Sequence, residues 1–284
     1  VVTDIEIELT SGFEASIASF SLYNTFDMEN SVYRIEDAKP YILLGSSVEI
    51  ALGYEKEAAP VFNGYISRVN FVYEQGDAPG IRITAMDVKG AMMANKYSRQ
   101  LTATSYGEAV KEILQKGPYA SMSNAEIIKD LIITDTPDKS LTLTVPPKAS
   151  DRTIEMTAES DYEFVVKAAK KYNYEFFTEC GYVYFRPAKA NAEVMMEMGP
   201  GEGLRFFDIE YDITGLVETV KARSTDVSKA RLIEVKQKMN NKISIGNKAK
   251  KFIKKSEKIY LDATITSKEE AEHRVKSLVE EISF

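Results

Sequence analysis

Polar and apolar residues alternate along much of the first hundred positions of the chain. Near the N-terminus Ile5, Ile7 and Leu9 alternate with acidic residues. The same period of two returns in three later segments, residues 48–54, 69–73 and 81–85. A period of two places successive side chains on opposite faces of a strand. The pattern predicts a small antiparallel barrel or sandwich, in which Ile5, Ile7 and Leu9 are buried and the acids between them face water.

Helical periodicity begins after residue 95. Ser105 and Glu108 have the spacing of a capping box, and so do Ser160 and Glu163. Each pair precedes apolar residues at helical spacing, which are Ala109, Val110, Ile113 and Leu114 in the first helix and Tyr162, Val165, Val166, Ala169 and Tyr172 in the second. The pattern also favours a helix at residues 125–133 and a strand at 141–145. Two aromatic segments around Cys180 and Gly181 predict a hairpin.

A glycine-rich stretch, residues 199–203, interrupts the chain before a third block. A phosphate-binding loop would have to open a helix, but the residues that follow, 204–209, have the pattern of a strand. We therefore interpret the stretch as a linker. Strands are expected again at three places, residues 216–222, 232–235 and 259–265. A helix with a capping-box start is expected at 267–282.

These elements predict an α+β fold that is mainly β, with two small antiparallel β-barrels flanking an α+β domain. The expected domains are a first barrel at residues 1–95, a middle domain at 96–202 and a second barrel at 203–284. Repeated strand-rich blocks around the helical block support this division.

Charge divides unevenly along the chain, although the net charge is only −7. Residues 1–95 hold six Lys and Arg against fourteen Asp and Glu, whereas residues 229–258 hold eleven against two. The basic stretch contains one aromatic residue, Phe252, and single-strand nucleic-acid sites interleave several stacking rings with their cations. We therefore expect residues 240–258 to form a solvated loop, or a loop that docks on an acidic partner.

No apolar run is long enough to span a bilayer, and the acidic N-terminus does not resemble a signal peptide. With one Cys and one His, the chain has neither an internal disulfide nor a zinc site built from several such ligands. His273 should lie exposed on the back of the last helix, where it would be poorly placed to act as a base.

Carboxylates are abundant, and a glycosidase needs two of them about 5 to 10 Å apart. Three pairs are close in sequence, Asp135 with Asp138, Glu155 with Glu159 and Asp161 with Glu163. None has a surrounding cluster of aromatic platforms, and Trp is absent. The first-turn acids Asp161 and Glu163 are better explained by the helix dipole. We predict no catalytic, cofactor-binding or metal-binding residue.

Several strings in order resemble the baseplate hub family of contractile tails, which includes phage late control protein D, the VgrG hub region and the hubs of phage-tail-like bacteriocins. The strings are Phe62-Asn63-Gly64-Tyr65-Ile66, residues 81–87, 105–114 and 160–165, the two hairpin segments, residues 211–217 and residues 266–271. The resemblance extends over nearly the whole chain.

The resemblance implies a homotrimer whose two barrels per chain form a pseudo-sixfold ring between a hexameric tail tube and a trimeric spike. It implies tube, spike and other baseplate proteins as partners, no membrane and no cofactor, with DNA or cargo passing through the lumen without specific binding. The particle, assembled in the bacterial cytoplasm, would be a virion or a phage-tail-like one. No spike β-helix or oligosaccharide-binding-fold repeat follows in the sequence, so we expect the spike in a separate chain or beyond Phe284. The family's second barrel usually continues with strands after a helix like 267–282, so we expect this barrel either to be incomplete at Phe284 or to be completed in another way.

Two other functions stay open from the sequence. The chain could be the hub region of a peptidoglycan-degrading tail enzyme whose catalytic domain is absent from these residues. It could also be a carbohydrate- or nucleic-acid-binding β domain, a hypothesis that rests on the basic stretch alone. Exposed aromatic residues favour an assembling protein, and some of Tyr23, Phe26, Tyr33, Phe62, Tyr65, Phe71 and Tyr73 should bury between protomers. The acidic first block should leave a negative lumen.

We predict that these residues carry no hydrolase activity. Zymography of the chain on bacterial cell walls should show no clearing, because no carboxylate pair has a site around it. A muramidase assayed on the same gel is the positive control. Clearing that a single Asp or Glu substitution abolishes would contradict the prediction.

Overall fold

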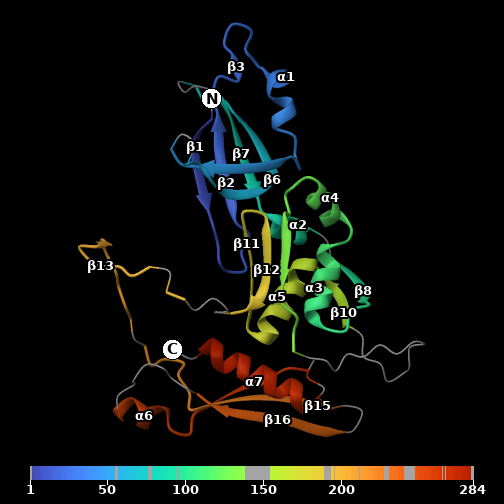
Figure 1. The fold of residues 1–284 in the computed structure, drawn as a ribbon, viewed down its shortest axis with the longest axis vertical. Helices are drawn as coiled ribbons and strands as arrows, with labels where there is room; N and C mark the ends of the chain where they lie inside the picture. The colour runs from blue at the N-terminus through green and yellow to red at the C-terminus, as the bar shows by residue number, and fades with distance from the viewer. Residues whose placement is uncertain are drawn as a thin grey trace. The chain divides into compact units, whose positions relative to one another are not determined.

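The computed structural model describes residues 2–54, 57–75, 79–94, 96–137, 154–188, 193–194, 196–210, 212–226, 230–239, 247–263, 265 and 267–282. The fold is α+β and mainly β (Figure 1). It divides into two compact units, Val1–Ala169 with Tyr174–Arg186, and Lys170–Asn173 with Pro187–Phe284. No helix in the described part of the chain has both the length and the apolar composition needed to cross a membrane.

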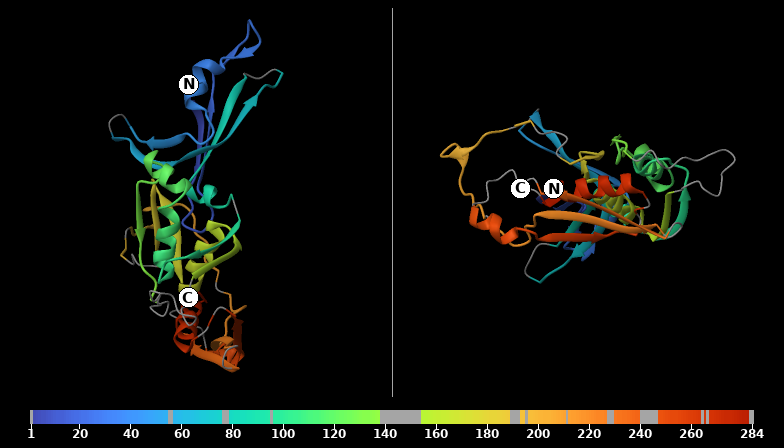
Figure 2. Two further views of the ribbon diagram at one scale, coloured as in Figure 1. Left: turned by 90° about the vertical axis from the view of Figure 1, so that its right-hand side faces the viewer. Right: turned by 90° about the horizontal axis from the view of Figure 1, so that it is seen from below.

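A five-stranded antiparallel sheet forms the first part of the first unit, in the order β1-β2-β7-β6-β5. Its strands are β1 Val2–Glu8, β2 Ile17–Leu22, β5 Ser47–Leu52, β6 Ala59–Val72 and β7 Gly80–Met86. The sheet curls into a half-barrel (Figure 2), in which the long strand β6 pairs with β5 along its first half and with β7 along its second. Its edges are β1 and β5, which do not pair with each other among the described residues.

The alternation of β7 gives the burial that the sequence predicts, because Ile81, Ile83 and Ala85 are all buried. The prediction for the first strand is wrong. Ile5 is 45% exposed and Leu9 is 59% exposed. The register of β1 against β2 shifts between Thr3 and Glu6, and Asp4 has a φ of 53°. A bulge of this kind breaks the alternation of faces, and β1 is also an edge strand with a neighbour on one side only.

Between β2 and β5 the chain makes a small excursion. It contains β3 Phe26–Asp27, β4 Val32–Tyr33, the helical turn α1 Ile35–Ala38 and the 3₁₀ turn η1 Lys39–Tyr41. Just after η1, Ile42 is buried with Ile66, Ile81 and Ile83 in one apolar cluster of the half-barrel.

The second part of the first unit packs helices and short strands around a larger apolar core. Its elements are α2 Val88–Met92, β8 Tyr97–Leu101, α3 Tyr106–Leu114, α4 Pro118–Asn124, β9 Asp130–Ile133, β10 Ile154–Glu159, α5 Asp161–Tyr172, β11 Tyr174–Glu179 and β12 Tyr182–Pro187. β8 pairs with β10, and β9 joins the hairpin in the order β11-β12-β9.

Both capped helices form where the sequence predicts them. The Ser160 hydroxyl accepts from the Glu163 amide, and the Glu163 carboxylate accepts from the Ser160 amide. At α3 the Ser105 hydroxyl accepts from the Glu108 amide, while the Glu108 carboxylate accepts from Thr104 instead. The buried stripe of α5 is shifted, because Phe164 and Ala168 are fully buried whereas Tyr162 and Val166 are half-buried.

The predicted helix at residues 125–133 is wrong. The helix α4 lies earlier, with Pro118 at its first position, where the fixed φ of proline suits a helix start. Residues 130–133 instead form β9, whose β-branched side chains favour a strand and which pairs in parallel with β12. The strand expected at residues 141–145 lies outside the described residues.

The hairpin predicted around Cys180 is confirmed. Cys180 and Gly181 form its two-residue turn, with φ values of 48° and 90°. Two central residues with positive φ match the right-handed twist of the flanking strands. A Cβ at Gly181 would come within 3.0 Å of the Asn63 and Lys129 side chains, so glycine also permits this close approach.

The second unit contains a three-stranded sheet in the order β16-β15-β17. Its elements are the short β13 Gly199–Pro200 and β14 Gly203–Leu204, then β15 Thr219–Asp226, β16 Arg231–Lys238, α6 Asn247–Ile253, β17 Glu257–Leu261 and α7 Lys268–Ile282. β15 pairs antiparallel with β16 and parallel with β17. The helix α7 covers one face of the sheet through Ala271, Val275 and Leu278.

Two sequence expectations fail in this unit. Residues 205–210 form no strand, although their pattern predicts one, and only Gly203–Leu204 belongs to β14. The basic stretch is not simply a loop, because its described part contains α6 and the start of β17; residues 240–246 lie outside the described residues. The described strands of this unit also differ in order and direction from the five antiparallel strands of the first sheet.

We predict that Ser160→Ala lowers the free energy of unfolding by about 1 kcal/mol, because it removes the hydroxyl that caps α5. Chemical denaturation followed by circular dichroism measures this change. Ser47→Ala, at an exposed strand position, is the matched control and should change stability by less than about 0.5 kcal/mol. Equal effects of the two substitutions would show that the cap contributes nothing.

Candidate functional site

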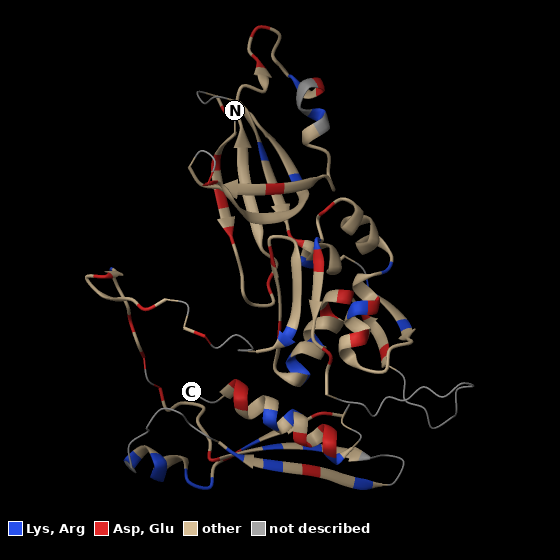
Figure 3. Cartoon of the chain, viewed as in Figure 1, with Lys and Arg blue, Asp and Glu red and all other residues tan. Residues whose placement is uncertain are grey.

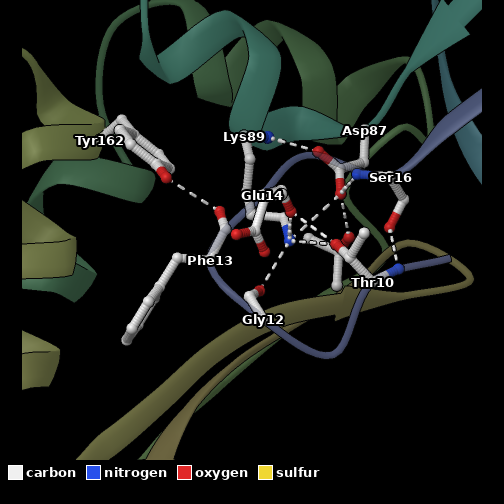
Figure 4. Close-up of polar contacts among 9 residues, drawn as sticks. Thr10, Gly12, Phe13, Glu14, Ser16, Asp87, Lys89 and Tyr162 are labelled. Carbon is white, nitrogen blue, oxygen red and sulfur yellow. Dashed lines mark hydrogen bonds and ion pairs between the residues drawn. The ribbon is translucent and has the colours of Figure 1, made fainter.

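A buried carboxylate, Asp87, lies where the first sheet meets the second part of the same unit (Figure 4). Its Oδ1 accepts from the Lys89 amide at 2.9 Å and so caps α2. Its Oδ2 accepts from the Ser16 amide at 2.9 Å and from the Thr178 hydroxyl at 2.5 Å. One carboxylate therefore binds the start of β2, the start of α2 and the hairpin strand β11.

The ammonium group of Lys89 is fully buried beside this carboxylate, with Nζ 3.7 Å from Asp87 Oδ2. It donates to the Thr10 hydroxyl at 3.4 Å, to the Gly12 carbonyl at 3.3 Å and to the Glu14 carbonyl. Burial lowers the pKa of Lys89, and the Asp87 carboxylate acts in the opposite direction. Three acceptors surround Lys89 Nζ, one for each N–H donor of an ammonium, so its hydrogen bonds hold the fold.

The loop that these contacts hold is also fixed from α5. The Tyr162 hydroxyl donates to the Phe13 carbonyl at 3.1 Å (Figure 4). Asp87, Lys89 and Tyr162 together fix the loop between β1 and β2 against α2, α5 and β11. We call Asp87 and Lys89 with their partners the buried polar centre, and its geometry is that of a structural clamp.

A second buried carboxylate, Asp161, has an equally structural environment. It accepts from the Tyr119 hydroxyl at 2.7 Å and pairs with Arg99 at 3.0 Å. Burial, together with the Asp161 carboxylate, raises the pKa of Tyr97 to about 12. The neighbouring Glu163 instead caps α5 and pairs with Lys96 at 2.7 Å. The structure thus gives Asp161 and Glu163 separate partners and no shared site.

The other sequence candidates also have structural partners. Glu159 pairs with Lys167 at 2.8 Å, and Asp135 accepts from the Ser105 hydroxyl and the Thr136 amide. Asp138 lies outside the described residues. His273 is half-buried on α7, so the prediction of an exposed side chain is wrong. In the described ranges, no three Asp, Glu, His or Cys side chains gather as metal ligands would.

Cys180 lies half-buried in its hairpin turn, where its thiol donates to the Pro60 carbonyl at 3.1 Å. Burial raises its pKa, which makes a reactive thiolate less accessible. Two further contacts join the first sheet to the second part of the unit: Asn63 Nδ2 donates to the Glu126 carbonyl at 3.0 Å, and Lys129 pairs with Glu49 at 2.5 Å. These long-range contacts leave no local sign in the sequence.

A cluster of partly exposed rings, which we call the aromatic patch, joins the small β3-β4 hairpin to the end of β6. Phe26 and Tyr33 meet edge to face at 4.9 Å, Tyr33 and Phe71 at 5.1 Å, and Phe26 and Tyr73 are 5.7 Å apart. Tyr73 is 64% exposed. Large exposed apolar clusters on a soluble protein mark interaction sites. Phe62, by contrast, is buried in its own chain, so it cannot pack between protomers.

Charge follows the two units as the sequence indicates (Figure 3). Glu6 and Glu8 are exposed on the edge strand β1. In the second unit lysines occupy α6 and the sheet face away from α7, where Lys221 pairs with Glu257 and Arg223 with Glu234. The buried polar groups described above stabilise the fold. The candidate functional site is therefore the exposed surface, above all the aromatic patch.

Comparisons with known proteins bear on the family and the fold of the chain. The family model described as the Alg8 N-terminal domain matches residues 15–276. No curated protein matches the sequence significantly. The 43 kDa tail protein of prophage MuSo2 from Shewanella oneidensis is similar in structure, with a TM-score of 0.55 and 15% identity over 96% of this chain and 71% of that one.

A tail protein from Neisseria meningitidis MC58 is similar to the same degree. Its TM-score is 0.54 at 12% identity, over 92% of this chain and 67% of that one. At such identities the likeness shows the fold alone. The chain therefore has the fold of phage tail proteins over nearly its whole length.

We predict that Lys89→Met lowers the free energy of unfolding by about 3 kcal/mol, because it leaves the Asp87 carboxylate buried without its counter-ion. Urea denaturation followed by circular dichroism measures the loss. The matched control is Lys96→Met, which removes an exposed ion pair and should change stability by less than about 1 kcal/mol.

If Lys89→Met does not fold, Thr178→Val tests the same clamp more gently. It removes one hydrogen bond to Asp87 and should lower stability by about 1 kcal/mol. Parental stability in both Lys89→Met and Thr178→Val would contradict the clamp.

Proposed function

The chain belongs to the family described as the Alg8 N-terminal domain and shares a fold with phage tail proteins, and we propose that it is a structural baseplate hub protein of a contractile tail or injection particle. The observation that carries the proposal is a tail-protein fold over 96% of the chain. The order of motifs in the sequence, which resembles the hub family from residue 62 to residue 271, narrows that fold to the hub.

A hub must join partners of different symmetry, and this chain would do so as a homotrimer. Its first sheet and its C-terminal sheet would each contribute a barrel-like segment, giving a ring of pseudo-sixfold symmetry between the tail tube and the spike. Closed symmetry lets each copy bury the same surface. The aromatic patch and the edge strands β1 and β5 support this, because the described residues of a single chain leave the patch partly exposed and each edge strand with one neighbour.

The proposal assigns no catalytic role to these residues. Three of the buried charged groups, Asp87, Lys89 and Asp161, are each bound to structural partners. The acidic edge strand, with Glu6 and Glu8 exposed, supports a lumen that repels DNA or other polyanionic cargo passing through it. The protein would act in a virion or a phage-tail-like particle, in contact with tube, spike and other baseplate proteins.

The alternative function is the hub region of a peptidoglycan-degrading tail enzyme. It would use the same assembly surfaces and differ only in a catalytic domain outside these residues. The same fold and the same surfaces serve both, so the assembly experiment applies to either.

We predict that the purified chain, alone or with its tube and spike partners, scatters light as three times the 31.8 kDa mass of one chain or as a larger complex containing three copies. The double substitution Phe71→Ser, Tyr73→Ser should weaken assembly at least about tenfold, because aromatic anchors carry much of an interface's free energy.

Tyr182→Ser is the matched control, since Tyr182 is an exposed tyrosine outside the aromatic patch and should assemble normally. A chain that stays monomeric in the presence of its partners would overturn the hub proposal.

A further inference from the structure

Residues 207–213 have the pattern of a strand and form none. The sequence alternates strictly between apolar residues, at positions 207, 209, 211 and 213, and acids, at positions 208, 210 and 212. In the structure the described residues of this segment have no strand or helix, and every one of them is exposed. Phe207 is 58% and Ile209 is 61% exposed. We call residues 207–213 the acidic segment.

A strand pattern needs a neighbouring strand, because the N–H and C=O groups of an isolated strand have no partners. The acidic segment leads into β15, which begins at Thr219 and already pairs with β16 on one side and β17 on the other. The segment therefore cannot add beside the strand that follows it. Its described residues pair with no other strand, and Asp212 and Ile213 at its end accept hydrogen bonds from the Thr214 and Leu216 amides. Its composition nevertheless suits a half-buried strand.

The same unit contains an edge with complementary chemistry. β17 ends the sheet on one side, and its own residues alternate. Ile259 and Leu261 are exposed on the face away from α7, and Leu261 is 78% exposed. Lys258 lies on the other face, 5.3 Å from the ring of Tyr260. An added strand would thus meet an apolar row on one face and a positive charge on the other.

The surroundings of this edge strengthen the charge complementarity. The helix α6 precedes β17 and carries Lys250 and Lys251, and Lys254 follows it. All three side chains are exposed, and no carboxylate in the described part of the chain pairs with them. The acidic segment has three carboxylates and no cation. Opposite charges on adjacent strands stabilise pairing, whereas like charges oppose it.

The other edge of the sheet fits less well. On its face away from α7, β16 presents Leu232, Glu234, Lys236 and Lys238. This row contains one apolar residue and one acid, so it would place Glu234 close to an apolar or acidic side chain of the added strand. β17 also has an acid on that face, Glu257, which pairs with Lys221, but the next two residues of the same row, Ile259 and Leu261, are both apolar.

We propose that the acidic segment of one copy adds as a strand to the free edge of β17 in a second copy of this chain. The inference rests on the proposed function, since a ring supplies the second copy. Phe207, Ile209 and Ile213 would extend the apolar row of Ile259 and Leu261. The carboxylates at 208, 210 and 212 would lie on the side of Lys258. The addition would link neighbouring subunits through backbone hydrogen bonds as well as through side chains.

Cysteine cross-linking between two differently tagged chains tests the pairing. Both carry Cys180→Ser, so that no native thiol competes. One carries Ile209→Cys and the other Ile259→Cys, and the two are mixed, allowed to assemble and mildly oxidised. We expect a disulfide between the two tags. A partner carrying Leu232→Cys, exposed on the opposite edge strand, is the matched control and should cross-link at least about tenfold less.

Charge provides an independent readout. Asp208→Lys with Glu210→Lys should reduce the cross-link about fivefold or more, as expected for loss of favourable cross-strand pairs and gain of repulsion. Reversing Lys254 and Lys258 to Glu in the partner should restore it. Lys111→Glu with Lys268→Glu, at exposed positions elsewhere, should leave the cross-link unchanged.

If the variants do not fold, hydrogen exchange on the unmodified chain tests the same pairing. On assembly, the amides of residues 207–213 and of the β17 edge should gain protection together. Equal cross-linking to Ile259→Cys and Leu232→Cys would overturn the inference. So would a disulfide formed only within one chain that carries both Ile209→Cys and Ile259→Cys, because it would place the segment on its own sheet.

Light scattering on the same samples separates the two proposals. An assembled oligomer with neither cross-link nor protection overturns the strand addition and leaves the hub proposal standing. A monomer in the presence of tube and spike partners overturns both.

Discussion

The first unit depends on a single buried ion pair. Asp87 and Lys89 lie two residues apart at the end of β7, yet their partners come from the loop between β1 and β2, from α2 and from β11. Without them the curled sheet and the helical part would share few polar contacts among the described residues, chiefly those of Tyr162, Asn63, Glu49 and Cys180. A buried charge without its partner is strongly destabilising, so the pair makes one arrangement of these elements much more stable than others.

The residues that stabilise the fold are therefore different from the exposed residues that could bind a partner. The buried Asp87 and Lys89 hold backbone groups, while exposed apolar side chains lie on the edge strands and in the aromatic patch. A protein that binds several partners through exposed surfaces needs a stiff structure beneath them. Ordering a flexible surface costs free energy and so weakens binding. Here the buried polar centre supplies the stiff frame, and the exposed surfaces belong to the sheet that it fixes.

Local signals in the sequence predict local structure well. The capping boxes at Ser105 and Ser160 mark real helix starts, and the Cys180-Gly181 turn lies where a hairpin is expected. The alternation of β7 gives its burial because both of its neighbours are present in the same chain. Where a strand has a neighbour on one side or none, the alternation of apolar and polar residues gives wrong predictions. It predicts burial at Leu9 and a strand at residues 204–209, and both predictions are wrong.

The polar centre could not be predicted in the same way. Asp87 directly after an alternating strand indicates a helix cap, and that signal is local. Nothing near Lys89 indicates that its ammonium is buried, because its acceptors belong to residues 10–14, more than seventy positions away. The error at residues 125–133 has a related cause, since β9 becomes a strand by pairing with the distant β12. The local sequence gives no information about such distant partners.

The bulge at Asp4 affects how readily a free subunit aggregates. An open sheet presents unpaired backbone groups that invite edge-to-edge aggregation, and β1 is such an edge. The kink at Asp4 and the charges of Glu6 and Glu8 disfavour pairing with a flat strand of an unrelated chain. In the proposed assembly, a subunit built in this way would accumulate without aggregating before its partners are made. Its concentration would then limit the rate at which the proposed particles are completed.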